Sequence, residues 1–400
     1  MAAHHVVALE VGTSKVVALV GETREDGGLA IIGMGEHSSR GVRKGEVVDL
    51  ENALACVRGA LHGAEESAQT TIDRVHVAIS GGHIQSQINR GTTRVLSPDG
   101  EISDKDIELV MDNAQATSLP SEREIMHTIC GRYCVDDQQY VANPRGLSGA
   151  KLSLDMLALH GVRSRLHNTI KVVQGVPMDV HDVAFSGLCA GMAVLTPEHK
   201  EIGALVVDLG AGTTSYVAYS GKILTAAGAF GVGGEHVTND ISLAFNVSLR
   251  QAEFLKIDHG NAVVDLANRT RRVDPPAEVG FPERPVNLSS LHVVINVRMR
   301  ELLEMVKARV ELGEGGGSLG AGVILTGGGA RLRGITELAE KVFNVPCHVG
   351  KPQDVDGPAA AVEGPEYAVG VGMVRYGFTN PPEESGFSLK DWFMGLFGKG

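Results

Sequence analysis

The sequence has no long apolar run, and this absence limits how the chain can relate to a membrane. No stretch of 18 consecutive apolar residues occurs among its 400 residues, whereas a membrane-spanning helix needs about 20. The opening residues, MAAHHVVALEVG, place Glu10 inside an apolar run and contain no basic segment, so they predict a first strand and not a signal peptide. We therefore expect no segment that crosses a bilayer.

Basic residues are fewer than acidic ones, and cysteines are few. The chain has 36 Lys and Arg against 48 Asp and Glu, a net charge of -12, which argues against a nucleic-acid partner. Its five cysteines are odd in number and scattered, which indicates reduced thiols. Cys130 and Cys134 form a C-x3-C pair, but no second pair follows to complete a zinc site, which needs about four ligands.

Glycine, in contrast, is abundant, and two glycine-bearing segments resemble each other. They are VVALEVGTSKVVALVGE at 6–22 and ALVVDLGAGTTSYVAYSGK at 204–222, each an apolar strand, an acid, a turn with Gly and hydroxyls, and a second strand. Such turns expose backbone N–H groups that bind anions, so two facing turns would hold a polyphosphate. Glu10 and Asp208 stand at matching strand ends, where a carboxylate can hold Mg²⁺ through water. Two ordinary hairpin turns are the alternative, and the matching acids favour phosphate binding.

A third glycine cluster is VILTGGGARLRGI at 323–335, an apolar strand that runs through three glycines into a helix. A strand, a glycine-rich turn and a helix form a general arrangement for contacting a nucleotide. By itself the cluster is compatible with a Rossmann-like turn. The order of two hairpins followed by this cluster points to a different fold.

This order resembles the actin-like ATPases and, more closely, the FtsA family of bacterial cell-division proteins, over nearly the whole chain. The resemblance is carried by LEVGTSKVVALVGE, IIGMGEHSSRGVRKGEVVDLE, VHVAISGGHI, NPRGLSGAKL, FSGLCAGMAVLT, GALVVDLGAGTTSYVAYSGK, GVGGEHVTNDIS, AEFLKIDHGNA, GVILTGGGARLRG and YAVGVGMVRYG, in this order, and by the tail. It implies an α/β fold, namely an actin-like two-half ATPase fold with a duplicated nucleotide-binding core, an inserted small α+β module and a C-terminal amphipathic helix.

The resemblance also implies a site for ATP and Mg²⁺. The implied nucleotide-binding residues are Gly12, Thr13, Ser14 and Lys15 in a first phosphate loop, Gly210, Ala211, Gly212, Thr213 and Thr214 in a second, Gly233 and Gly234 beside the cleft, Glu253 and Lys256 at the ribose and base, and Gly327, Gly328 and Gly329 at the adenosine, with Glu10 and Asp208 at the metal. A surface ion pair is the alternative for Glu253 and Lys256. Ser215 stands where many such loops have Asp, so we expect ATP binding with weak or absent hydrolysis, and we assign no catalytic residue.

The expected organisation follows the same resemblance. The first half takes 1–82 and 163–200, the inserted module 83–162, the second half 201–234 and 316–377 with a smaller lobe at 235–315, then a linker at 378–386 and a terminal helix at 387–400. Locally, we expect helices at 51–69 and 292–312 and a capping box of Ser103 and Asp106. The apolar residues near helical spacing in the second helix are Val294, Val297, Leu302, Met305 and Val306. Small residues four apart, Gly187 with Gly191 and Ala368 with Gly372, predict two closely crossing helices, which in this fold form the hinge between halves.

The segment FSLKDWFMGLFGKG at 387–400 contains the single tryptophan of a chain that is 4% aromatic. Its apolar residues are Phe387, Leu389, Trp392, Phe393, Leu396 and Phe397, and from Leu389 onward they fall on one helical face. Such a face suits an anionic membrane surface. Docking on the protein's own core is the alternative. One short tail anchors weakly, whereas a filament with many tails binds through avidity.

The family resemblance implies a protein that polymerises and tethers the tubulin-like FtsZ ring to the cytoplasmic face of the cell membrane at the septum. The implied partners are the FtsZ C-terminal tail, bound in a pocket that contains Arg298, other copies of the chain, and later division proteins. Two alternatives remain. A pilus-assembly relative lacks this kind of tail, and a small-molecule kinase of the same superfamily needs a carboxylate base, for which the sequence shows no clear candidate.

Overall fold

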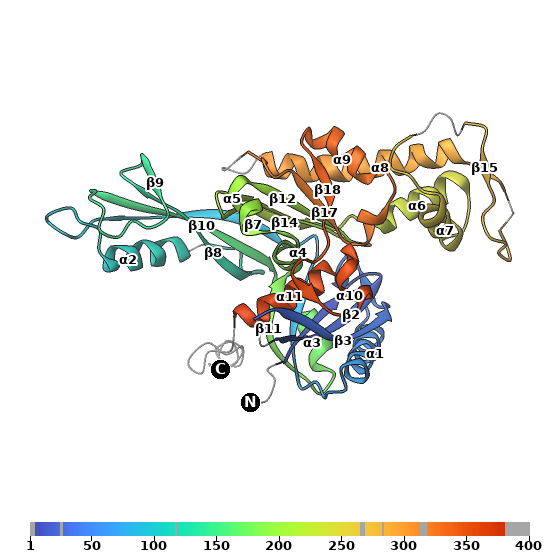
Figure 1. Cartoon of the computed structure of the whole chain (residues 1–400), viewed down its shortest axis with the longest axis horizontal. Coiled ribbons are helices and arrows are strands. Elements are labelled where there is room, and N and C mark those ends of the chain that lie inside the picture. Colours follow the sequence, from blue (N-terminus) through green and yellow to red (C-terminus); the bar gives the residue numbers. More distant parts are fainter. Residues whose placement is uncertain are drawn as a thin grey trace.

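The protein, seen here in a computed structural model, is described over residues 5–24, 27–116, 118–264, 269–281, 284–311 and 318–380. Figure 1 shows a lower body formed around the N-terminal strands, an upper body formed by later parts of the chain, and an arm that extends to the left. None of the helices in these ranges combines the length and the hydropathy that a membrane-spanning segment requires. The expected terminal helix at 387–400, with its six apolar residues, lies outside the described residues.

The lower body contains a six-stranded sheet in the order β11-β6-β1-β2-β3-β19. Its strands are β1 (His5–Val11), β2 (Lys15–Thr23), β3 (Leu29–Ser38), β6 (Arg74–Ile79), β11 (Asp179–Phe185) and β19 (Val355–Asp356). Helix α1 (Leu50–Ala68) packs on β3, and α11 (Ala368–Thr379) packs on β1 from the other face, while α3 (Arg163–Gln174) lies beside α1. The expected helix at 51–69 is thus confirmed as α1.

The upper body and the arm share one nine-stranded sheet, in the order β18-β17-β12-β13-β14-β7-β10-β8-β9. The upper body supplies β12 (Ala204–Leu209), β13 (Thr214–Ser220), β14 (Ile223–Phe230), β17 (Val323–Thr326) and β18 (Cys347–Val349). The arm supplies β7 (Gln85–Arg94), β8 (Arg123–Val135), β9 (Gln139–Val141) and β10 (Lys151–Val162), with α2 (Asp104–Gln115) packed on β7. The arm is inserted in the sequence of the lower body, yet β7 joins the upper sheet through Gln85 opposite Gly228.

A helical lobe stands beside the upper sheet. It contains α6 (Gly234–Phe245), α7 (Leu249–His259), α8 (Leu288–Glu311) and the short pair β15 (Arg272–Val273) and β16 (Val286–Asn287). The long helix expected at 292–312 is confirmed as α8. Its buried face includes Ile295, Met299 and Leu302, whereas Val297 is 62% exposed, so its expected place on the apolar face was wrong.

Short elements complete the described chain. They are β4 (Val42–Arg43), β5 (Glu46–Val47), α4 (Ser186–Val194), α5 (Pro197–Ile202), η2 (Gly328–Arg331), α9 (Ile335–Phe343), α10 (Ala359–Glu363) and η3 (Pro365–Tyr367). The expected capping box is confirmed at the start of α2, where the Asp106 carboxylate accepts hydrogen bonds from the Ser103 backbone N–H at 2.8 Å and the Ser103 hydroxyl at 2.6 Å.

Helices α4 and α11 cross closely, as their small residues predicted. A Cβ placed on Gly372 would lie 1.7 Å from the backbone oxygen of Cys189, so the two helix backbones are in contact there. Helix α11 packs on β1, β2 and β6 of the lower sheet, while α4 packs on β12 and β13 of the upper sheet. The crossing therefore joins the two bodies near the centre of the molecule (Figure 1).

Candidate functional site

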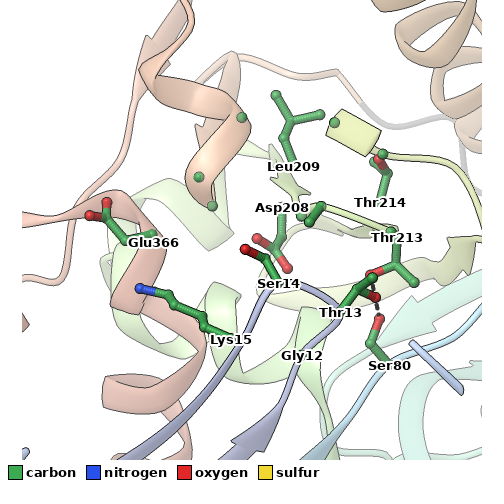
Figure 2. Close-up of a pocket in the computed structure, with 18 of the residues that line it drawn as sticks. Gly12, Thr13, Ser14, Lys15, Ser80, Asp208, Leu209, Thr213, Thr214 and Glu366 are labelled. Carbon is green, nitrogen blue, oxygen red and sulfur yellow. Dashed lines mark hydrogen bonds between the residues drawn. The ribbon is translucent and has the colours of Figure 1, made fainter. Parts of the chain in front are cut away.

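A pocket of about 530 Å³ lies between the two bodies (Figure 2), within the roughly 300–1,000 Å³ of ligand sites. Its lining comes from the β1–β2 and β12–β13 hairpin turns, the start of α6, the faces of α7 and α8, and the glycine turn at η2. Every residue predicted to bind nucleotide or metal lines this one pocket. The structure therefore brings them together, and their contact with a nucleotide stays a prediction.

The two hairpin turns have the same local geometry. In the first, the Gly12 N–H donates to the Lys15 carbonyl at 3.0 Å, and in the second the Gly210 N–H donates to the Thr213 carbonyl at 2.9 Å. The turns meet across the pocket, because a Cβ on Gly212 would lie 2.4 Å from the Thr13 hydroxyl oxygen. Glycine is required by this close approach, and it leaves backbone N–H groups open to an anion from both sides.

Two carboxyl groups face the pocket from the ends of matching strands, Glu10 on β1 and Asp208 on β12. Burial, together with the nearby Asp208 charge and against the opposing effect of Lys15, raises the pKa of Glu10 to about 8. Burial also raises the pKa of Asp208 to about 7. Two neighbouring carboxyls that repel each other are a suitable donor set for a divalent cation, which stabilises both of them in the ionised form.

The raised pKa of Glu10 predicts a pH dependence of stability in protein without nucleotide or metal. A carboxyl whose pKa is higher in the folded state contributes stability below its ordinary pKa of 4.5, and that contribution is lost as the pH rises to about 8. We expect wild type to lose about 1.4 kcal/mol per pH unit in this window relative to Glu10→Gln, which does not titrate. Denaturant unfolding at several pH values measures the difference, and parallel curves for the two proteins would contradict it.

Below the hairpins lies a cluster of hydroxyl groups that the sequence did not reveal. The Ser215 hydroxyl, fully buried, lies 3.1 Å from the Ser80 hydroxyl and 3.1 Å from the Ser186 hydroxyl, and Ser80 donates to the Thr213 hydroxyl at 3.2 Å. Ser80 follows β6, Ser186 begins α4, and Ser215 lies on β13, so the cluster joins both bodies beneath the second phosphate loop. Ser80 lies at the carboxyl end of a parallel strand, where ligands often bind, and only this position could have indicated from the sequence that Ser80 belongs to the site.

The opposite wall of the pocket contains an ion pair and apolar side chains. Lys256 donates to Glu253 at 2.7 Å, to the Thr238 hydroxyl at 2.9 Å and to the Gly234 carbonyl at 3.2 Å, so α7 is tied to the start of α6. The predicted place of Glu253 and Lys256 at the nucleotide site and the alternative of an ion pair are therefore compatible, because the two residues form an ion pair and also line the pocket. A Cβ on Gly328 would meet no atom within 4 Å, so this turn faces open space. The apolar lining includes Ile257, Met299 and Leu302.

Comparison with known proteins identifies related sequences over most of the chain. The family model "Cell division protein FtsA" matches residues 205–372, and the model "SHS2 domain inserted in FTSA" matches residues 81–160, the region of the arm. The chain is 33% identical over 384 residues to the cell division protein FtsA of Pseudomonas aeruginosa, which covers 96% of this chain and 92% of that protein. It is 34% identical over 379 residues to FtsA of Escherichia coli K12, with 93% of this chain and 90% of that protein covered.

Solved structures with the same fold have much lower identity. A PilM–PilN type IV pilus biogenesis complex matches with a TM-score of 0.62 at 16% identity, over 94% of this chain and 99% of that chain. MreB5 of Spiroplasma citri bound to ADP matches with a TM-score of 0.54 at 13% identity, over 99% of each chain. These matches confirm the expected actin-like two-half fold, and the second family model confirms the inserted module.

Proposed function

Since the chain belongs to the FtsA family of cell-division proteins, we propose that it binds Mg-ATP between its two halves, assembles into filaments, and links the FtsZ ring to the membrane. The observation that carries the nucleotide part of this proposal is the meeting of the two hairpin turns across a pocket lined by the carboxyls of Glu10 and Asp208. The fold, shared with an MreB structure that holds ADP, gives further support.

In this proposal each wall of the pocket has one role. The turns at 12–15 and 210–214 hold the phosphates with backbone N–H groups, Glu10 and Asp208 hold hydrated Mg²⁺, and Glu253 with Lys256 contacts the ribose and base. The bound nucleotide supplies a polyphosphate that both halves contact at once. Ser215, which stands where many related loops have Asp, has a fully buried hydroxyl 3.1 Å from that of Ser186, and Glu253 and Glu366 are paired with Lys256 and Arg331. We therefore propose that hydrolysis is weak or absent.

The helical lobe is the proposed site for the FtsZ tail. On α8, Arg298 donates to Asp240 at 2.6 and 3.1 Å and to Glu301 at 2.6 Å, and its side chain is 28% exposed. The exposed Val293 and Val297 precede it on the same helix. An acidic and apolar peptide would meet this apolar surface and would compete with Asp240 and Glu301 for the guanidinium.

The Arg298→Gln variant is expected to bind an FtsZ C-terminal peptide about tenfold more weakly, because a charge-assisted hydrogen bond contributes about 1.5–3 kcal/mol. Fluorescence anisotropy with a labelled synthetic peptide measures the affinity. Arg309→Gln is the matched control, since Arg309 lies exposed near the C-terminal end of the same helix. Equal affinities for wild type and Arg298→Gln would remove Arg298 from the pocket.

The membrane part of the proposal is tested by co-sedimentation with anionic liposomes. The full chain is expected to pellet with the liposomes, and more of it with Mg-ATP, because filaments present many weak anchors together. A chain stopped after residue 386 is the control and is expected to stay in the supernatant. If both proteins pellet, or neither does, the segment at 387–400 is not the anchor, and the pilus-assembly and kinase alternatives return.

A further inference from the structure

Residues 364–367, which we call the bridge segment, are attached to the upper body at the edge of the pocket. The Glu366 carboxylate accepts two hydrogen bonds from the Arg331 guanidinium of η2, at 2.8 and 2.6 Å. The Pro365 carbonyl accepts from the Thr326 hydroxyl at 2.8 Å and from the Gly327 N–H at 3.0 Å. These contacts join the bridge segment to β17 and to the glycine turn.

Tyr367, the last residue of the bridge segment, contacts the lower body. Its hydroxyl donates to Glu36 Oε2 at 2.8 Å, and the same oxygen accepts a hydrogen bond from Lys15 Nζ at 2.9 Å. The Lys15 ammonium also lies 3.8 Å from the centre of the Tyr367 ring. Lys15 is part of the first phosphate turn, and Figure 2 shows it on the same side of the pocket as Glu366. Lys15 therefore connects the proposed phosphate site with the bridge segment.

The Lys15 ammonium is charged and is held by partners that can be exchanged. Burial lowers the pKa of Lys15, but the hydrogen bonds to Glu36 and Tyr367 outweigh this effect, and the pKa lies above its usual value. The side chains of Lys15 and Glu36 are 24% and 40% exposed, and ion pairs open to solvent in this way are weak. A polyphosphate carries more negative charge than one carboxylate and would attract the same ammonium.

The bridge segment continues directly into α11, which begins at Ala368. This helix crosses α4 with backbone contact at Gly372 and ends at Thr379. A change in the contacts of Tyr367 therefore acts on the first turn of the helix that joins the two bodies.

We propose that the bridge segment senses nucleotide: the Lys15 ammonium exchanges Glu36 and Tyr367 for the bound phosphates, and the freed Tyr367 loosens the start of α11. Glu36 and Tyr367 are then positioning residues, which hold Lys15 in the unloaded protein and do not themselves line the pocket. This inference rests on the proposed binding of Mg-ATP, and it adds the route by which occupancy reaches the crossing helix.

Hydrogen exchange of the full chain, with and without Mg-ATP, tests the inference. In wild type, Mg-ATP is expected to speed amide exchange in the first turn of α11, from residue 368, by about threefold or more. Tyr367→Phe and Glu36→Gln each remove one part of the contact, so exchange there is expected to be fast without nucleotide and to change less than about twofold on its addition. Their affinity for Mg-ATP is expected to stay within about threefold of wild type.

Tyr376→Phe is the matched control, because its hydroxyl bonds to Asp182 at 2.9 Å near the other end of α11 and has no part in the bridge. This variant is expected to keep the wild-type response to Mg-ATP. If Mg-ATP leaves amide exchange in the first turn of wild-type α11 unchanged, or changes it equally in Tyr367→Phe and wild type, the inference is overturned while the proposed function stands. A direct titration that finds no ATP binding to wild type would overturn the proposed function as well.

Discussion

Replacing Asp208 with asparagine is expected to lower the affinity for Mg-ATP by about 100-fold, since interactions with a charged group contribute about 1.5–3 kcal/mol. Asp208 is buried at the end of β12 and faces the pocket, so its charge acts where water does not screen it. Asparagine has the same shape and leaves the fold of the hairpin intact. Isothermal titration calorimetry in the presence of Mg²⁺ measures the difference.

Two controls separate the metal from other effects of this substitution. In EDTA, wild type and Asp208→Asn are expected to bind ATP equally weakly, because the carboxylate acts through the cation. Asp182→Asn removes a carboxylate that Tyr376 contacts at 2.9 Å, away from the pocket lining, and is expected to bind Mg-ATP as wild type does. Wild-type affinity in Asp208→Asn would remove this residue from the site.

The second large effect is expected at the crossing of α4 and α11. Gly372→Ala places a Cβ 1.7 Å from the Cys189 carbonyl oxygen, 2.4 Å from its carbon and 2.9 Å from its Cα. These are backbone atoms inside the core, so the two helices must separate along their contact. We expect the free energy of unfolding to fall by about 3 kcal/mol, at the upper end of the usual cost of overpacking.

Gly370→Ala is the matched substitution on the same helix. Its Cβ would lie 2.8 Å from the terminal Cδ1 of Leu19, a side-chain methyl that can move, and the expected loss is about 1 kcal/mol. Denaturant unfolding of the two variants beside wild type measures both losses. Equal stability of the two variants would show that the contact at Cys189 does not limit the approach of the helices.

The features that sequence predicted well are those with a local pattern. The two hairpins could be recognised because each strand, acid and glycine turn lies within about twenty residues, and the hydrogen bonds at Gly12 and Gly210 show the same turn in both. The placement of Glu10 and Asp208 at the same pocket could be predicted because they occupy matching positions in these hairpins. The α4–α11 crossing followed from small residues four apart on each helix.

Features formed by distant residues had no such pattern. Ser80 meets Thr213 across 133 positions, and Tyr367 meets Glu36 across 331, so neither contact could be read from neighbouring residues. The pairing of β7 with β14 gave no signal either, because strand order depends on tertiary packing. Val297 was misplaced because the apolar residues of α8 fit more than one helical face until its neighbours are known.

Titration of the wild-type chain with ATP decides whether the pocket between the two halves binds Mg-ATP. We expect saturable binding of one nucleotide per chain in Mg²⁺, and a large loss of affinity in EDTA. If the folded protein shows no saturable binding in millimolar ATP with Mg²⁺, the pocket is not a nucleotide site.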